Sequence, residues 1–295
     1  MAIEFFNYTD DIRRFAPQIK SDAKLESFGP FLLPVKNKVV NLISQATYDA
    51  LKTAFDDSEA ETSTLGKAAM HLRAAMANFM AIPYFIFEAK ERNNTDSALY
   101  RYQEDQQKEI YLENAFSQFD ELLSLMDANI ADFAGYAATD RYKVRETLYL
   151  KSPAKFNRFF SIDNSAYFFN NTIFIQEEII NEEVKSRISG YPIVTGDDLQ
   201  YNLGKAVAYR TVANAILHFD YTELPKGIRT DIQKEASAKK ASEAEAKEAF
   251  FVRFNSRADE FFLKVERALN ESLNDGVFTI PEDSQTEDDK FFFPS

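Results

Sequence analysis

The stretch Leu65-Gly66-Lys67-Ala68 recurs in the second half of the chain as Leu203-Gly204-Lys205-Ala206. Each copy begins a segment that is rich in alanine and carries apolar residues at helical spacing. A pattern that returns along one chain indicates a duplicated structural unit. The repeat therefore predicts two similar helical bundles in tandem.

Further matches flank the two copies and keep the same order in both halves. The matched pairs are Val35 with Ile180, Val39 with Val184, Ile43 with Ile188, Ser44 with Ser189, Ala75 with Ala213, Ala77 with Ala215, Phe119 with Phe262, Leu122 with Val265 and Met126 with Leu269. Four-residue matches arise often by chance, whereas a shared order of several features favours duplication. We expect Pro83 and Pro225 to end the alanine-rich helix of each half.

The composition independently favours helices. The chain has 295 residues, of which 45% are hydrophobic and 27% charged, as in ordinary globular proteins. Only 8 residues are glycine. Sandwiches and doubly wound α/β folds of this length need more glycines for their turns and phosphate-binding loops. We therefore expect an all-α fold.

Helical periodicity and capping residues locate the expected helices. They cover residues 12–15, 25–43, 65–87, 96–126, 165–188, 199–219 and 225–273, with a short helix after Ser152-Pro153. The last one is a long polar helix, and its middle, 234–247, is expected to project from the body or lie on its surface.

The chain is thereby divided into three parts. Residues 1–139 form the first helical repeat, and residues 140–274 form the second with its long closing helix. Residues 275–295 are an acidic and aromatic arm with no expected fold of its own. Gly66 and Gly204 are expected to mark a close helix crossing, because glycine lets helices approach. The lysine after each glycine makes no phosphate-binding loop, since the rest of that motif is missing.

Residue types that carry chemistry are scarce. The absence of cysteine excludes disulfides and thiol catalysis, and two histidines, His71 and His218, exclude a multi-histidine metal site. The neighbouring acids Glu177, Glu178, Glu182 and Glu183 could suggest a carboxylate metal site. A di-iron bundle also needs Glu-x-x-His motifs, which neither histidine provides, so a solvated helix face is the simpler interpretation. We predict a protein that is not an enzyme and has no cofactor or metal.

Charge and hydropathy restrict the partners. The net charge of −13 disfavours binding of nucleic acid through the general surface. The densest basic group is Arg141, Lys143, Arg145, Lys151, Lys155 and Arg158. It could meet an acidic partner or a phosphate backbone, although a linker between two acidic halves is simpler. The N-terminus lacks export-signal features, and the apolar stretch 74–87 is shorter than the roughly 20 residues of a membrane span.

The chain ends in Phe291-Phe292-Phe293-Pro294, directly after an acidic stretch. Exposed apolar clusters of this kind usually need a cover. In one interpretation these four residues dock on their own domain. In the other they anchor the chain to a neighbouring subunit or partner, held by an acidic tether.

The segment KFNRFFSIDNSAYFF, residues 155–169, with the helices that follow it, resembles an uncharacterised protein family of tailed phages and prophages of Bacteroidota. Members of that family pair two helical halves, each with an aromatic entry and an Ala/Asn-rich helix. The family is similar to head–tail connector proteins (neck or adaptor) encoded near the portal gene. The first half of this chain departs from the pattern, because 6–15 lacks the Asn-Ser pair and Pro30 and Pro34 interrupt its long helix.

The resemblance implies a structural protein of the virion. Connector subunits form a ring, usually of about twelve copies, between the portal protein and tail or further neck proteins. DNA passes through the lumen without specific binding, and the protein would reside in the host cytoplasm during assembly. A helical scaffold or cargo protein remains the alternative. A helical enzyme that uses acidic residues and Mg²⁺ is disfavoured, because no acidic motif has metal-ligand spacing.

Overall fold

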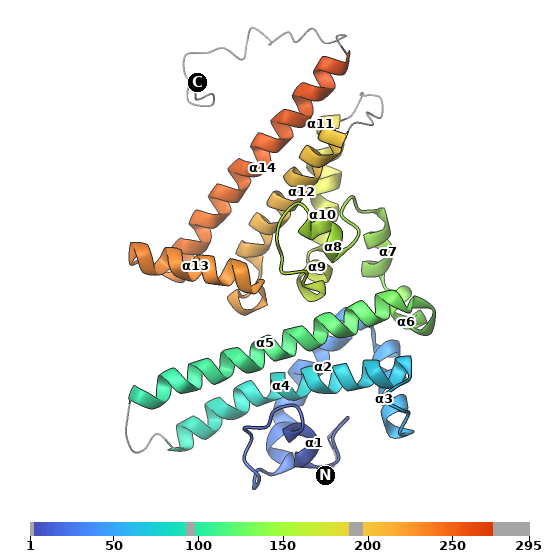
Figure 1. Ribbon diagram of the computed structural model, residues 1–295, viewed down its shortest axis with the longest axis vertical. Coiled ribbons are helices and arrows are strands. Elements are labelled where there is room, and N and C mark those ends of the chain that lie inside the picture. Colours follow the sequence, from blue (N-terminus) through green and yellow to red (C-terminus); the bar gives the residue numbers. More distant parts are fainter. Residues whose placement is uncertain (1–2, 93–97, 189–196, 274–295) are drawn as a thin grey trace.

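The computed structural model describes residues 3–92, 98–188 and 197–273. In these ranges the regular structure is helical, apart from one isolated bridge between Ile3 and Phe6. The expected all-α fold is confirmed (Figure 1). Among the described helices, none combines the length and apolarity that crossing a membrane requires. The predicted arm, including Phe291 to Pro294, lies outside the described residues.

The first half is built around a pair of long antiparallel helices, α4 and α5. Its elements are α1 (Thr9–Arg13), η1 (Leu25–Phe28), α2 (Gly29–Ile43), α3 (Gln45–Asp56), α4 (Thr64–Arg92), α5 (Ala98–Ala128), η2 (Ile130–Asp132) and α6 (Ala134–Ala137). Helices α1, α2 and α3 pack against α4, and α5 faces the second half of the chain (Figure 1).

The second half contains a comparable long pair, α12 and α14. Its elements are α7 (Asp140–Thr147), α8 (Pro153–Asn157), α9 (Ala166–Asn171), α10 (Ile173–Ile179), the π-helical turn η3 (Ile180–Val184), α11 (Lys185–Ile188), α12 (Asp197–His218), η4 (Tyr221–Glu223), α13 (Lys226–Lys239) and α14 (Glu243–Leu273). Helix α14 lies at the edge of the molecule, beside α12 (Figure 1).

Two separate hydrophobic cores support these helix pairs. The first joins residues between 3 and 136 with Ala166 and Tyr167, and the second joins residues between 148 and 262. The gap from 136 to 148 contains the predicted division after residue 139. Of the matched repeat positions, Ala75 and Ala213 are fully buried, as are Ala77 and Ala215. The alanine pattern thus serves helix packing in both halves.

The structure corrects two helix boundaries. Pro83 does not end the alanine-rich helix but lies inside α4, which continues to Arg92. Met80 and Tyr84 on either side of Pro83 are buried in the first core, so tertiary packing offsets the lost backbone hydrogen bond. The expected helix 165–188 is also divided, because α9 ends at Asn171 and a π turn follows α10.

The expected long polar helix 225–273 is two helices. Lys240 adopts a left-handed conformation with φ of 52° and separates α13 from α14. Ser242 and Glu245 then form a capping box at the start of α14, in which Ser242 N donates to Glu245 Oε2 at 2.7 Å. The stretch 234–247 therefore forms the turn of a helical hairpin between α13 and α14, in which Ala246 is buried and most other residues are exposed.

Candidate functional site

Helix α14 buries one stripe of side chains and leaves the opposite face open. The buried stripe is Ala246, Phe250, Ala258, Phe262, Val265 and Leu269. On the opposite side of the helix, Val252 is 54% exposed and Leu263 is 44% exposed. Each of these two apolar side chains offers a contact that another molecule could cover, and polar and charged residues lie between them on the same face. We call the face that carries these two residues the crest of α14.

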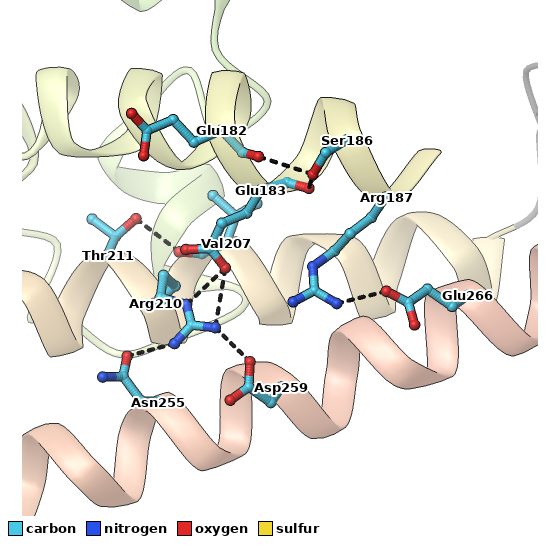
Figure 2. Close-up of polar contacts among 10 residues, drawn as sticks. All are labelled: Glu182, Glu183, Ser186, Arg187, Val207, Arg210, Thr211, Asn255, Asp259 and Glu266. Carbon is cyan, nitrogen blue, oxygen red and sulfur yellow. Dashed lines mark hydrogen bonds and ion pairs between the residues drawn. The ribbon is translucent and has the colours of Figure 1, made fainter. Parts of the chain in front are cut away.

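Arg210 of α12 ties one flank of α14 to the rest of the second half (Figure 2). Its Nε donates to Glu183 Oε2 at 3.0 Å, and its Nη1 donates to Asn255 Oδ1 at 2.9 Å. Nη2 also donates to Asp259. The arginine side chain is only 14% exposed, whereas its acidic partners Glu183 and Asp259 are 30% and 52% exposed. One guanidinium therefore holds the π turn, α12 and α14 together, and we call this group the Arg210 clamp.

A second ion pair extends the clamp towards the end of α14. Arg187 of α11 donates to Glu266 Oε1 at 2.6 Å (Figure 2). The Arg187 guanidinium also lies 4.7 Å from the ring centre of Phe262. Ion pairs with a planar guanidinium fix orientation as well as distance. The outer helix is thus rigidly placed although only one side of it is buried.

The other flank of α14 contains a hollow of about 460 Å³. Its lining residues are Tyr209, Arg253, Phe254, Ser256, Arg257 and Glu260. Half-buried aromatic rings form the base, with Tyr209 and Phe254 at 5.8 Å and Tyr209 and Phe261 at 5.7 Å between ring centres. We call this feature the α12–α14 hollow.

Positive charge collects around the hollow. Lys205 lies 5.9 Å from the ring centre of Tyr209, and Lys264 lies 4.9 Å from that of Phe261. Arg253 and Arg257 add two more cations to the lining. Glu260 pairs with Arg257, and Glu235 pairs with Arg253 at 3.2 Å. The local charge stays positive on a chain whose net charge is −13.

The two halves meet through charged groups. Lys38 of α2 donates to Glu223 Oε1 at 2.6 Å, and Tyr167 Oη donates to the same oxygen at 2.9 Å. Arg145 pairs with Asp127 at 2.7 Å, so part of the predicted basic linker fastens the halves together. A cavity of about 210 Å³ lies beside these contacts and is lined by residues of both halves.

Asp120 of α5 caps the second half at the same junction. Its Oδ1 accepts hydrogen bonds from Tyr167 N at 2.7 Å and Ser165 Oγ at 3.1 Å, at the start of α9. Burial raises the pKa of Asp120 to about 6, although these hydrogen bonds act in the opposite direction. The junction therefore contains a carboxyl group that titrates near neutral pH.

Both predicted packing glycines lie in crowded places. We expected another helix to cross at each glycine, but the nearest atoms belong to connecting segments, one before α4 and one after α8. A Cβ atom at Gly66 would lie 2.1 Å from the carbonyl oxygen of Ala60, in the segment before α4. A Cβ atom at Gly204 would lie 2.6 Å from the ring of Phe159, just after α8. Each glycine admits a turn against the start of its helix.

Two of the remaining candidate residues, Glu183 and His71, have structural partners. Glu183 belongs to the Arg210 clamp, and among the described residues no group of three or more ligands could hold a metal ion. His71 Nδ1 lies 2.9 Å from Gln118 Oε1 and links α4 to α5. Sequence reasoning missed the α12–α14 hollow. The available signal was arginine and phenylalanine alternating along one face of α14, at Phe250, Arg253, Phe254 and Arg257.

Comparison with known proteins gave no relative. No family model matches the chain, and no curated protein or solved structure matches it.

Proposed function

We propose that the protein is a subunit of a head–tail connector in a tailed phage, a ring between portal and tail through which DNA passes. The observation that carries this proposal is the crest of α14, a rigid helix face with Val252 and Leu263 exposed. The choice of a phage connector as the assembly that covers it rests on the resemblance of residues 155–169 to the phage family.

The mechanical properties of the second half suit such a role. A ring subunit needs a stiff element whose exposed side meets its neighbour. The Arg210 clamp fixes α14 from one flank, while the buried stripe fixes it from α12. Because the Arg210 guanidinium is only 14% exposed and binds three groups at once, it holds the orientation of the crest without a second covering helix.

The net charge suits a channel for DNA. A ring of about twelve copies would carry on the order of 150 negative charges before counterion screening. Phosphate groups adhere to proteins mainly through lysine and arginine, so an acidic ring lets DNA slide. The alternative, a scaffold or cargo protein, would use the same crest without closing a ring.

Co-elution with the portal protein of the same genome tests the proposal. We expect the full chain to elute with the portal in gel filtration, and Val252→Glu with Leu263→Glu to abolish this co-elution. Ile110→Glu is the matched control, because Ile110 is 50% exposed on α5, away from the crest. Co-elution that survives the Val252→Glu and Leu263→Glu changes, an equal loss in the Ile110→Glu control, or no co-elution of the unaltered chain would contradict the proposal.

A further inference from the structure

We propose that the C-terminal segment of the chain, residues 281–295, docks into the α12–α14 hollow of its own molecule. This inference goes beyond the connector function and does not depend on it. It rests on the chemistry of the hollow, the composition of the segment and the distance between them.

The hollow offers two kinds of contact side by side. The half-buried rings of Tyr209, Phe254 and Phe261 form an apolar base. Arg253 and Arg257 line the edge, and the ammonium groups of Lys205 and Lys264 lie 5.9 Å and 4.9 Å from the centres of the adjoining rings. Such a site favours a ligand that combines carboxylates with aromatic rings.

The C-terminal segment has that composition. It carries five acids and one lysine before its three phenylalanines, at Glu282, Asp283, Glu287, Asp288, Asp289 and Lys290. The acids complement the cations at the edge, and Phe291 to Phe293 complement the aromatic base. Attraction of this kind acts over about 10 Å at moderate salt, so it also guides the segment to the hollow.

The distance favours the chain's own hollow over that of a second copy. At 1.5 Å per helical residue, Arg257 lies about 24 Å along α14 from Leu273, where the helix ends. A flexible Gly-rich chain as long as that from Leu273 to Phe291 would span about 23 Å on average, and the like charges of this stretch extend that reach. Effective concentration is highest when the average span of a tether matches the distance to its site. Docking within one molecule therefore prevails at ordinary protein concentrations.

Disulfide trapping tests this arrangement. Because the chain has no native cysteine, the two introduced cysteines are the only ones that can form a disulfide. The test pair is Ser256→Cys in the hollow with Ser295→Cys at the end of the chain. The control pair is Ser186→Cys with Ser295→Cys. Both serines are exposed, and each donates to a carbonyl four residues earlier, Ser256 to Val252 at 3.0 Å and Ser186 to Glu182 at 2.9 Å.

In the control pair, position 186 is easier for the end of an undocked C-terminal segment to reach than position 256. Ser186 precedes Arg187, which pairs with Glu266 near the end of α14, so an undocked segment meets Ser186 sooner than Ser256. Docking reverses this order. We expect the full-length Ser256 pair to close at least about tenfold faster than the Ser186 pair under mild oxidation, as a disulfide within one chain.

Two changes should remove this preference. Replacing Phe291, Phe292 and Phe293 by serine, or combining Arg253→Ser with Arg257→Ser, should bring the closing rate of the Ser256 pair down to that of the control or below. Equal rates in the unaltered background would overturn the proposal. Disulfides formed only between chains, at a rate that rises with concentration, would overturn it in favour of a second copy. No portal protein is needed, so the result is independent of the connector test.

Discussion

The two long helix pairs of the molecule share buried alanines but differ in what surrounds them. Pair α4–α5 is covered by α1 to α3 on one side and contacts α9 on the other. Pair α12–α14 lies at the edge, and α14 keeps an open crest (Figure 1). At the repeat position where the first half buries Leu72, the second half has Arg210.

Helices α5 and α14, the second members of the two pairs, differ in the same way: apolar residues of α5 correspond to polar residues of α14. In the alignment that matches Phe119 with Phe262, Leu112 and Phe116 of α5 correspond to Asn255 and Asp259 of α14. Apolar packing in the enclosed pair is thus replaced by the Arg210 clamp in the open one. The comparison teaches that similar alanine-rich helices can form an enclosed pair or a pair at the edge of the molecule. In the edge pair, hydrogen-bonded charged groups hold the flank of α14 that faces water.

The largest expected effect comes from exchanging these chemistries. Leu72→Arg places a charge in the first core at a fully buried position with no built clamp. We expect the free energy of unfolding to fall by about 4 kcal/mol or more, measured by urea denaturation. The reverse change, Arg210→Leu, should lower it by only about 1–2 kcal/mol, because Glu183 and Asp259 are 30% and 52% exposed. Similar losses for both variants would refute the distinction.

The two repeat glycines give a smaller and equally asymmetric effect. Gly66→Ala drives a Cβ atom against the backbone of Ala60, which must shift, whereas Gly204→Ala meets the movable ring of Phe159. Alanine also gains about 1 kcal/mol in a helix. We expect a net loss of about 2 kcal/mol for Gly66→Ala and less than about 1 kcal/mol for Gly204→Ala in thermal unfolding. The opposite order would contradict the assigned contacts.

The junction between the halves should respond to pH through Asp120. Its raised pKa of about 6 contributes stability that is fully present below about 3.8 and is lost as the pH rises through about 6. A shift of this size corresponds to at most about 3 kcal/mol, and we expect about half, because Asp120 keeps some contact with water.

Asp120→Asn isolates this contribution from the other carboxylates. Between pH 4 and pH 7.5, the parent should lose about 1.5 kcal/mol relative to the variant, measured as the difference between their unfolding free energies. A difference that stays constant over this pH range would show that the Asp120 carboxyl does not titrate at the junction.

The smallest expected effect on stability comes from the turn between α13 and α14. Helix α13 has no counterpart between α4 and α5 in the first half. Lys240 adopts a left-handed conformation between α13 and α14, which glycine adopts without strain. Lys240→Gly should therefore stabilise the protein by about 0.5–1 kcal/mol in thermal unfolding. Lys239→Gly, within α13, is the control and should destabilise it by a similar amount. Destabilisation by both variants would argue against the turn.

Much of the fold could be predicted from local patterns, because the expected bounds of α2, α5 and α12 agree with the structure to within a few residues. The continuation of α4 through Pro83 could not, since it depends on the burial of Met80 and Tyr84 by distant segments. The start of α14 was not predicted, although Ser242 and Glu245 have the spacing of a capping box in the sequence. The α12–α14 hollow was not predictable, because it brings Tyr209 beside Phe254, residues from helices far apart in sequence.

The mass of the full-length protein, alone and mixed with the portal protein of the same genome, tests the central claim most directly. The account predicts that the chain joins the portal in a particle containing about twelve copies. A monomer or small dimer whose mass does not change when the portal protein is added would contradict the connector function.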